Sequence, residues 1–146
     1  MKQNLSGHTP PVMPFLKMEF GRDSISTLRP DLLGGFIESS LGENASSLWM
    51  REFKASVKKV WFTILPVGWR GEWHTSPEYQ WVVPLSGRWY LKTRDGSYQE
   101  MGPGDIHWGS DVSDDPLKGH QSGQIGDDPC VLLMIQYDNT IINPDE

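Results

Sequence analysis

The chain has 146 residues and a formal net charge of -6. This length suits one domain with its own hydrophobic core, and the scattered lysines and arginines form no basic stripe that would bind nucleic acid. No apolar run reaches the roughly eighteen residues that a membrane span needs, and the first residues lack the apolar centre of a secretory signal, so the sequence predicts a cytoplasmic protein.

Glycine and proline occur 15 and 11 times and separate short apolar runs. This pattern predicts many tight turns and an all-β architecture. The seven tryptophans either line a ligand cavity or fill the core, and composition does not decide between the two. The single cysteine, Cys130, lies in the run "CVLLMIQY", which predicts a packed thiol without a disulfide partner.

The first third of the chain gives weak signals. Residues 1–14 are polar and contain prolines, so we predict a flexible arm in which His8 is solvated. Residues 30–33 predict one helical turn that ends at two glycines, and the remainder up to residue 44 predicts loops and short edge strands. The predicted organisation is therefore an arm with edge elements over residues 1–45 and a β-barrel over residues 46–146.

From Ser46 onward, short apolar runs alternate with turn signals. The runs are "SSLWMREFKAS", "VKKVWFTILPVG", "YQWVVPL", "RWYLKTR", "IHW", "HQSGQI" and "CVLLMIQY". Asp95-Gly96 is a strong hairpin signal, and "GPGD" at residues 102–105 predicts a second turn. Roughly seven strands at this spacing are typical of a sandwich or a closed barrel. The polar stretch "DVSDDP" lacks the alternation of a calcium loop and predicts a solvated lid.

The stretch "GEWHTSPEYQW" places polar residues on one side of a predicted strand pair. His74 and Ser76 are two residues apart and therefore share a face. If the bend at Pro77 preserves the alternation, Gln80 points to the same interior and Tyr79 points away. Three polar side chains inside a barrel need partners or a ligand, so this stretch is the candidate site.

The spacing of these residues resembles the first motif of the cupin superfamily, which runs from a glycine through two histidines and a glutamate to a second glycine. Gly68, His74 and Gly87 match that motif, while Ser76 replaces the second histidine and Gln80 replaces the glutamate. The resemblance extends over residues 57–137 and is nearest to small single-domain cupins with a degenerate metal motif.

The second cupin motif resembles "GPGD" followed by a strand and a histidine on the returning strand, which is His120. An alternative alignment uses Gly96, Gly104 and His107. It is disfavoured because "GPGD" would then lose its role as the turn before that strand. His107 is therefore an additional histidine, and the alternation across two bends leaves its direction open.

The resemblance implies a jelly-roll barrel with His74, Gln80 and His120 as ligands of a divalent iron, manganese, nickel or zinc ion. Two imidazoles and a neutral amide would leave such an ion net positive and therefore a strong Lewis acid. The alternative is a metal-free barrel in which His74 and His120 are acid/base groups, as in sugar epimerases of the related barrel type. Tyr90 and Tyr98 are candidate proton donors, with no signal that separates them from core residues.

Two functions from different classes are consistent with this site. The first is an isomerase, cyclase, lyase or dioxygenase for a small apolar or aromatic molecule, with His74, His120, Gln80 and His107 as its catalytic residues. The second is a barrel that binds or senses a small molecule without turnover. Cupins often pair through their N-terminal strands, so the resemblance also implies a homodimer with the arm before Ser46 at the interface.

Overall fold

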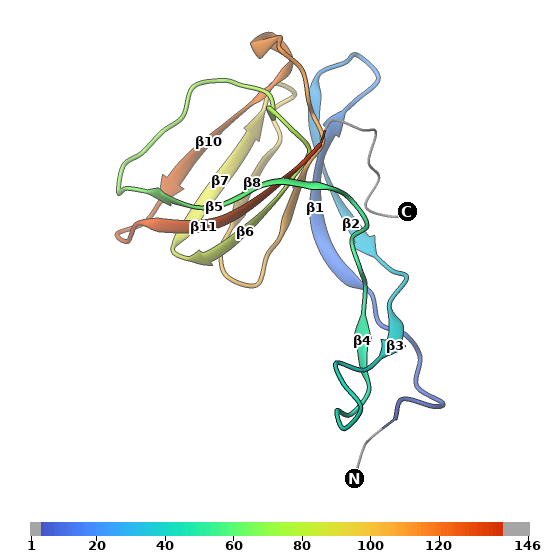
Figure 1. Cartoon of the computed structure of the whole chain (residues 1–146). Coiled ribbons are helices and arrows are strands. Elements are labelled where there is room, and N and C mark those ends of the chain that lie inside the picture. Colours follow the sequence, from blue (N-terminus) through green and yellow to red (C-terminus); the bar gives the residue numbers. More distant parts are fainter. Residues whose placement is uncertain (1–3, 139–146) are drawn as a thin grey trace.

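A computed structural model describes residues 4–138 of the chain and is built from β-strands, with one short 3-10 turn at Pro116–Lys118 (Figure 1). In this part of the chain no helix is long and apolar enough to cross a bilayer. The strands are β1 (Met13–Phe20), β2 (Ser26–Leu33), β3 (Ile37–Ser39), β4 (Leu48–Met50), β5 (Val57–Leu65), β6 (Gln80–Ser86), β7 (Arg88–Thr93), β8 (Tyr98–Met101), β9 (His107–Gly109), β10 (His120–Ile125) and β11 (Cys130–Tyr137).

Two larger sheets form the body of the fold. The first has six strands in the order β2-β1-β9-β6-β11-β5, and the second has three in the order β10-β7-β8. Neighbouring strands are antiparallel except β1 and β9, which run parallel. This all-β arrangement with a mixed sheet is compatible with a sandwich or jelly roll. A third, two-stranded sheet of β3 and β4 projects away from the body (Figure 1).

The inner core lies between the two larger sheets and follows from strand alternation. Each strand turns every second side chain inward, so Val82 of β6 meets Leu91 of β7 in one apolar cluster. Buried Cys130 belongs to this cluster, which confirms the predicted packed thiol. The other buried members are Leu16, Met18, Leu65, Trp89, Met101 and Leu132.

A second cluster covers the outer face of the six-stranded sheet. Trp81 and Trp108 lie there with their ring centroids 4.7 Å apart, and Phe53 packs edge-on against both rings. Phe53 and Phe36 come from the segment between β2 and β5, which folds back over the sheet. Trp81, Trp89 and Trp108 therefore pack in apolar clusters. Of the two roles that the sequence left open for the tryptophans, these three take the one in the core.

The predicted helical turn at residues 30–33 is wrong, because Ser26–Leu33 forms β2 along the whole length of β1. Proline lacks an N–H for the sheet, yet Pro30 is tolerated because β2 is the edge strand. The predicted strand around "SSLWMREFKAS" is confirmed only over Leu48–Met50. β1 and β2 join the same sheet as the later strands, and the division at residue 45 stays a prediction.

Both predicted turns are confirmed. Asp95 and Gly96 connect β7 to β8, and Gly96 has φ of 90°, which favours glycine. In the second turn the Asp105 carboxylate accepts a hydrogen bond from the Gly102 N–H at 2.9 Å. This turn precedes β9, and the residues that follow β9 belong to the candidate site.

Candidate functional site

His74 and His120 lie side by side although 46 positions separate them in the sequence. Each backbone N–H donates to the carbonyl of the other residue at 2.8 Å, which joins the approach to β6 to the start of β10. The imidazole rings are tilted by 60° and their centroids are 4.6 Å apart. The structure therefore brings the two predicted histidines together through an isolated antiparallel bridge.

His120 is held by a buried carboxylate. Its side chain is 4% exposed, and its Nδ1 lies 2.6 Å from Oδ2 of Asp111. An ionised carboxylate only accepts hydrogen bonds, so Nδ1 carries the proton and donates it. In the neutral ring, Nε2 then has its lone pair available as a proton acceptor.

Asp111 is fully buried and accepts two further hydrogen bonds. The hydroxyl groups of Ser26 and Ser76 each donate to it at 2.6 Å. Burial by itself would raise the pKa of this carboxyl, but the hydrogen bonds from His120 and the two serines outweigh burial and lower the pKa below its ordinary value. Asp111 is therefore an anion inside the protein, held by three buried hydrogen-bond donors.

Sequence reasoning missed Asp111 and Ser26. The prediction of a solvated lid at "DVSDDP" is wrong for Asp111, although Asp114 is exposed and Asp115 caps the 3-10 turn by accepting from Leu117 N–H. A usable signal was that Asp111 lies two residues after the end of the buried strand β9, whereas the other two acids lie further into the loop. Ser26 had no such signal, because it lies in a region read as loops.

His74 lies at the rim of the site and not among the buried residues. Its side chain is exposed, and its Nδ1 donates to the Glu72 carbonyl at 2.8 Å, which leaves Nε2 as the acceptor. Loss of hydration where the ring is covered, together with the neighbouring His120, lowers the pKa of His74. His74 is thus a neutral base at the entrance beside the hydrogen-bonded pair of Asp111 and His120.

Gln80 points inward, as the alternation predicts, and Tyr79 packs with the outer cluster. The Gln80 Oε1 accepts a hydrogen bond from the Gln136 side chain at 3.0 Å. Ser76 is also buried, and a Cβ added to Gly109 would lie 2.8 Å from its hydroxyl and 3.4 Å from Gln80 Cγ. The glycine therefore lets these two polar side chains pack closely against β9.

His107 is buried on the inner face of β9. Its side chain, whose direction the sequence left open, therefore points into the core. Its Nδ1 lies 3.3 Å from the Leu16 carbonyl, and its ring meets Trp89 edge-on at 5.9 Å. Burial, assisted by the nearby His120, lowers the pKa of His107 from 6.5 to about 4. His107 is therefore neutral at physiological pH and suits hydrogen bonding better than proton uptake.

The buried His107 makes stability depend on pH. Below pH 6.5 the unfolded chain takes up a proton at this residue that the folded protein does not take up until about pH 4. We expect the free energy of unfolding to fall by about 3 kcal/mol between these two pH values from this residue alone. Urea unfolding at pH 7, 5.5 and 4 measures the loss, which His107→Gln should reduce.

His8→Gln is the control for this experiment, because His8 is exposed near the N-terminus and should leave the pH dependence as it is in the wild type. His74 shifts in the same direction as His107, so part of the loss remains in every variant. Equal pH dependence in His107→Gln and the wild type would contradict the prediction.

The predicted metal ligands are in contact with other groups. In the described range 4–138, no group of three or more histidine, cysteine, aspartate or glutamate side chains is placed to hold a metal ion. Gln80 Oε1 already accepts from Gln136, so His74 and His120 offer two nitrogens, fewer than the three or four protein ligands of typical zinc sites. Metal binding by His74, Gln80 and His120 stays a prediction that these contacts do not favour.

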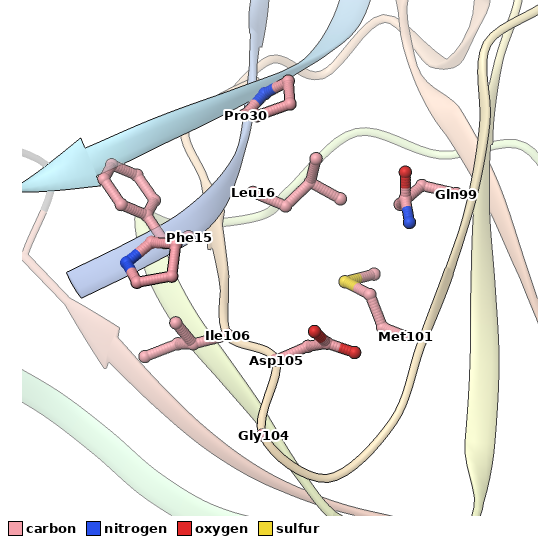
Figure 2. A pocket seen from close by; sticks show the side chains of 9 residues that line it. Phe15, Leu16, Pro30, Gln99, Met101, Gly104, Asp105 and Ile106 are labelled. Carbon is pink, nitrogen blue, oxygen red and sulfur yellow. The ribbon is translucent and has the colours of Figure 1, made fainter.

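Two surface cavities of about 190 Å³ lie away from the histidines. Leu16, Met101 and Ile106 are among the residues that line the first cavity (Figure 2). Ile106 precedes β9 in the chain, whereas Asp111 follows it. The second lies on the outer face of the six-stranded sheet beside Phe53 and Trp81. Neither cavity contains a predicted site residue.

Comparison with known proteins does not assign the chain to a family. No protein-family model matches the sequence, and no curated protein shows significant similarity to it.

Proposed function

We propose that this protein is an enzyme that moves a proton on a small organic molecule, with His120 as the general base and acid. The observation that carries this proposal is the buried Asp111 carboxylate 2.6 Å from His120 Nδ1. A carboxylate in this position fixes the tautomer of the imidazole and stabilises the imidazolium that forms when Nε2 accepts a proton.

A single base at a fixed position can both remove and return a proton, and this sets the proposed reaction class. His120 Nε2 removes a proton from the carbon next to a carbonyl, the electron pair moves into the carbonyl oxygen as an enolate, and the proton returns to the same or a neighbouring atom. Isomerisation, cyclisation and elimination all use this step. His74 stands 4.6 Å away, ring to ring, and exchanges the proton with solvent because its side chain is exposed.

We also propose how the two larger sheets are arranged and which class of substrate the protein binds. We infer that the two larger sheets close as a cupin-type jelly roll, because the bridge between His74 and His120 ties the approach to β6 to β10, an edge strand of the three-stranded sheet. An apolar or aromatic substrate with one carbonyl stays part of this proposal, on the tryptophan content of the sequence. The predicted dioxygenase chemistry needs a metal and is not part of this proposal.

Hydrogen–deuterium exchange tests the proposed base without knowledge of the natural substrate. A panel of small aliphatic and aromatic ketones and aldehydes is incubated with the protein in D₂O and a chelator, and loss of the α-proton is followed by NMR. At least one compound should exchange faster than in buffer. His120→Gln should reduce that exchange by about 10²–10⁴-fold, the usual contribution of a general base.

Gln121→Ala is the matched control, because Gln121 follows His120 on β10 and is only partly buried. It should keep exchange within a few-fold of the wild type, as expected of a change outside the base. Exchange that survives in His120→Gln, that requires an added metal ion, or that occurs with no compound would contradict the proposed base.

A second candidate function is ligand binding without turnover, which one observation favours. The indole N–H of Trp89 is buried in the inner core and has no hydrogen-bond partner among residues 4–138. A buried unpaired donor costs about 1–3 kcal/mol, and a ligand acceptor would remove that cost. Compounds that quench tryptophan fluorescence equally in the wild type and His120→Gln, without any α-proton exchange, would support this alternative.

A further inference from the structure

We propose that the first surface cavity, between β1 and β8, binds a small primary amine in its protonated form. The cavity has a volume of about 190 Å³, and its lining includes neither His74 nor His120. Binding there is therefore independent of the chemistry at His120. The place of the cavity in the fold, its acceptor atoms and its charge support this inference.

The cavity lies at an opening between the two larger sheets. β8 is an edge strand of the three-stranded sheet, and β2, next to β1, is an edge strand of the six-stranded sheet. Gln99 and Met101 are two positions apart on β8, so their side chains share the inner face of that strand. Met101 is 1% exposed, whereas Gln99 is exposed to solvent. The inner face of β8 is thus packed at Met101 and open at Gln99.

Most of the lining is apolar. Figure 2 shows Leu16 of β1 and Met101 of β8 pointing into the same space. Pro30 stands beside Leu16 in the pairing of β2 with β1, and Phe15 and Ile106 add further apolar surface. Drug-sized ligands occupy pockets of about 300–1,000 Å³, so this smaller cavity suits a compact hydrocarbon body of about one ring.

Two side-chain oxygen atoms give the cavity its polarity. The Asp105 carboxylate accepts a hydrogen bond from the Gly102 N–H through Oδ2, and in the described part of the chain its Oδ1 accepts none. The Gln99 amide nitrogen donates to the Glu100 carbonyl at 3.0 Å, while its Oε1 likewise accepts no hydrogen bond from a described residue. Figure 2 shows both side-chain ends directed at the space beside Leu16. A ligand that fits there supplies hydrogen-bond donors.

The charge of the lining favours a cationic donor. The nine lining residues include one carboxylate, that of Asp105, and no lysine, arginine or histidine. Among the described residues Asp105 forms no ion pair, and the net charge of -6 adds to the negative potential. A primary ammonium group combines one positive charge with three N–H donors, which matches a carboxylate beside an amide oxygen.

Binding of simple amines to the full chain tests this site. 2-Phenylethylamine, cyclohexylamine and butylamine are titrated into protein with ¹³C-labelled methionine methyl groups, and NMR should show a saturable shift of the Met101 signal for at least one of them. The neutral 2-phenylethanol and the anionic phenylacetate should bind more weakly than 2-phenylethylamine. Raising NaCl from about 20 mM to about 500 mM should weaken amine binding, because salt screens an exposed charge pair.

Two variants address the acceptors. Asp105→Asn removes the charge but keeps an oxygen for the Gly102 N–H, so the turn should persist. It should raise the Kd of the amine about threefold to fivefold, as expected for an exposed charge pair. Gln99→Lys places a permanent ammonium group beside the carboxylate and should abolish the amine-dependent shift of Met101. Circular dichroism checks that both variants are folded.

Asp127→Asn is the matched control, because it makes the same change of charge at an exposed residue outside the cavity. It should leave the Kd within error of the wild type. No Met101 shift with any of the three amines, or a shift that Gln99→Lys leaves intact, would overturn the site. Equal affinity for 2-phenylethanol and 2-phenylethylamine, or equal weakening in Asp105→Asn and Asp127→Asn, would overturn the role of the carboxylate in selecting an amine.

Discussion

Replacing Asp111 with alanine is expected to lower the free energy of unfolding by about 3–5 kcal/mol, because three buried donors lose their charged acceptor. The carboxylate accepts hydrogen bonds from Ser26, Ser76 and His120, and the substitution leaves all three donors buried without it. Each unpaired donor adds a desolvation cost, so the effect exceeds that of a simple loss of volume.

Urea unfolding at pH 7 and one fixed protein concentration measures this loss. Asp114→Ala is the control, since this acid is exposed in the same loop and should change stability by less than about 0.5 kcal/mol. The lowered pKa of Asp111 sets the sign of the pH dependence. Its contribution is present above pH 3.8, the ordinary value, and disappears as the pH falls through the lower pKa of the folded protein.

Equal losses in Asp111→Ala and Asp114→Ala would show that the buried network contributes nothing to stability. The same variants also bear on the chemistry, because Asp111 orients His120. Asp111→Asn removes the charge but keeps the size, and it should slow any α-proton exchange that the wild type catalyses.

Gly119→Ala is expected to lower the free energy of unfolding by at least about 3 kcal/mol, at the upper end of overpacking effects. An added Cβ would lie 2.0 Å from the carbonyl oxygen of His74 and 2.8 Å from the Thr75 nitrogen. Backbone atoms cannot move aside as a flexible side chain does. The strand start at His120 must therefore separate from His74, and the paired backbone hydrogen bonds between them break.

Two measurements follow this substitution. Urea unfolding gives the stability, and NMR cross-relaxation between the two imidazole rings, whose centroids are 4.6 Å apart in the structure, reports their contact. The cross-peaks should vanish in Gly119→Ala. Gly34→Ala is the control because its added Cβ would meet only a side-chain methyl at 3.8 Å. Retention of both stability and ring contact in Gly119→Ala would contradict the close approach.

The two substitutions point to one property of the site. The contacts that hold the start of β10 to the rest of the protein also position and orient the His120 imidazole. A damaged site should therefore appear as lost stability as well as lost chemistry. Gln121→Ala helps to separate the two, because it removes a β10 hydrogen bond, from the Gln121 side chain to the Gly71 carbonyl, that does not involve Asp111 or the His120 ring.

Local sequence patterns predicted much of the architecture. Strand alternation predicted that Gln80 faces inward and Tyr79 outward, and both predictions are confirmed. Turn chemistry predicted the bends at Asp95-Gly96 and at residues 102–105, because glycine there takes a backbone conformation that other residues avoid. The predicted helical turn at residues 30–33 was wrong, since pairing with β1 outweighed the local preference.

The sequence by itself determined the all-β class, the turns and the inward side of the strand that carries Gln80, because these depend on neighbours within a few residues. Only the tertiary structure decided which polar groups meet in the site. Ser26 lies 85 positions before Asp111, and Ser76 lies 35 positions before it. Their contact follows from the order of strands in the sheets, which short-range periodicity does not encode. For the same reason the direction of His107, and the burial of Asp111 in what reads as a solvated loop, became clear only in the folded chain.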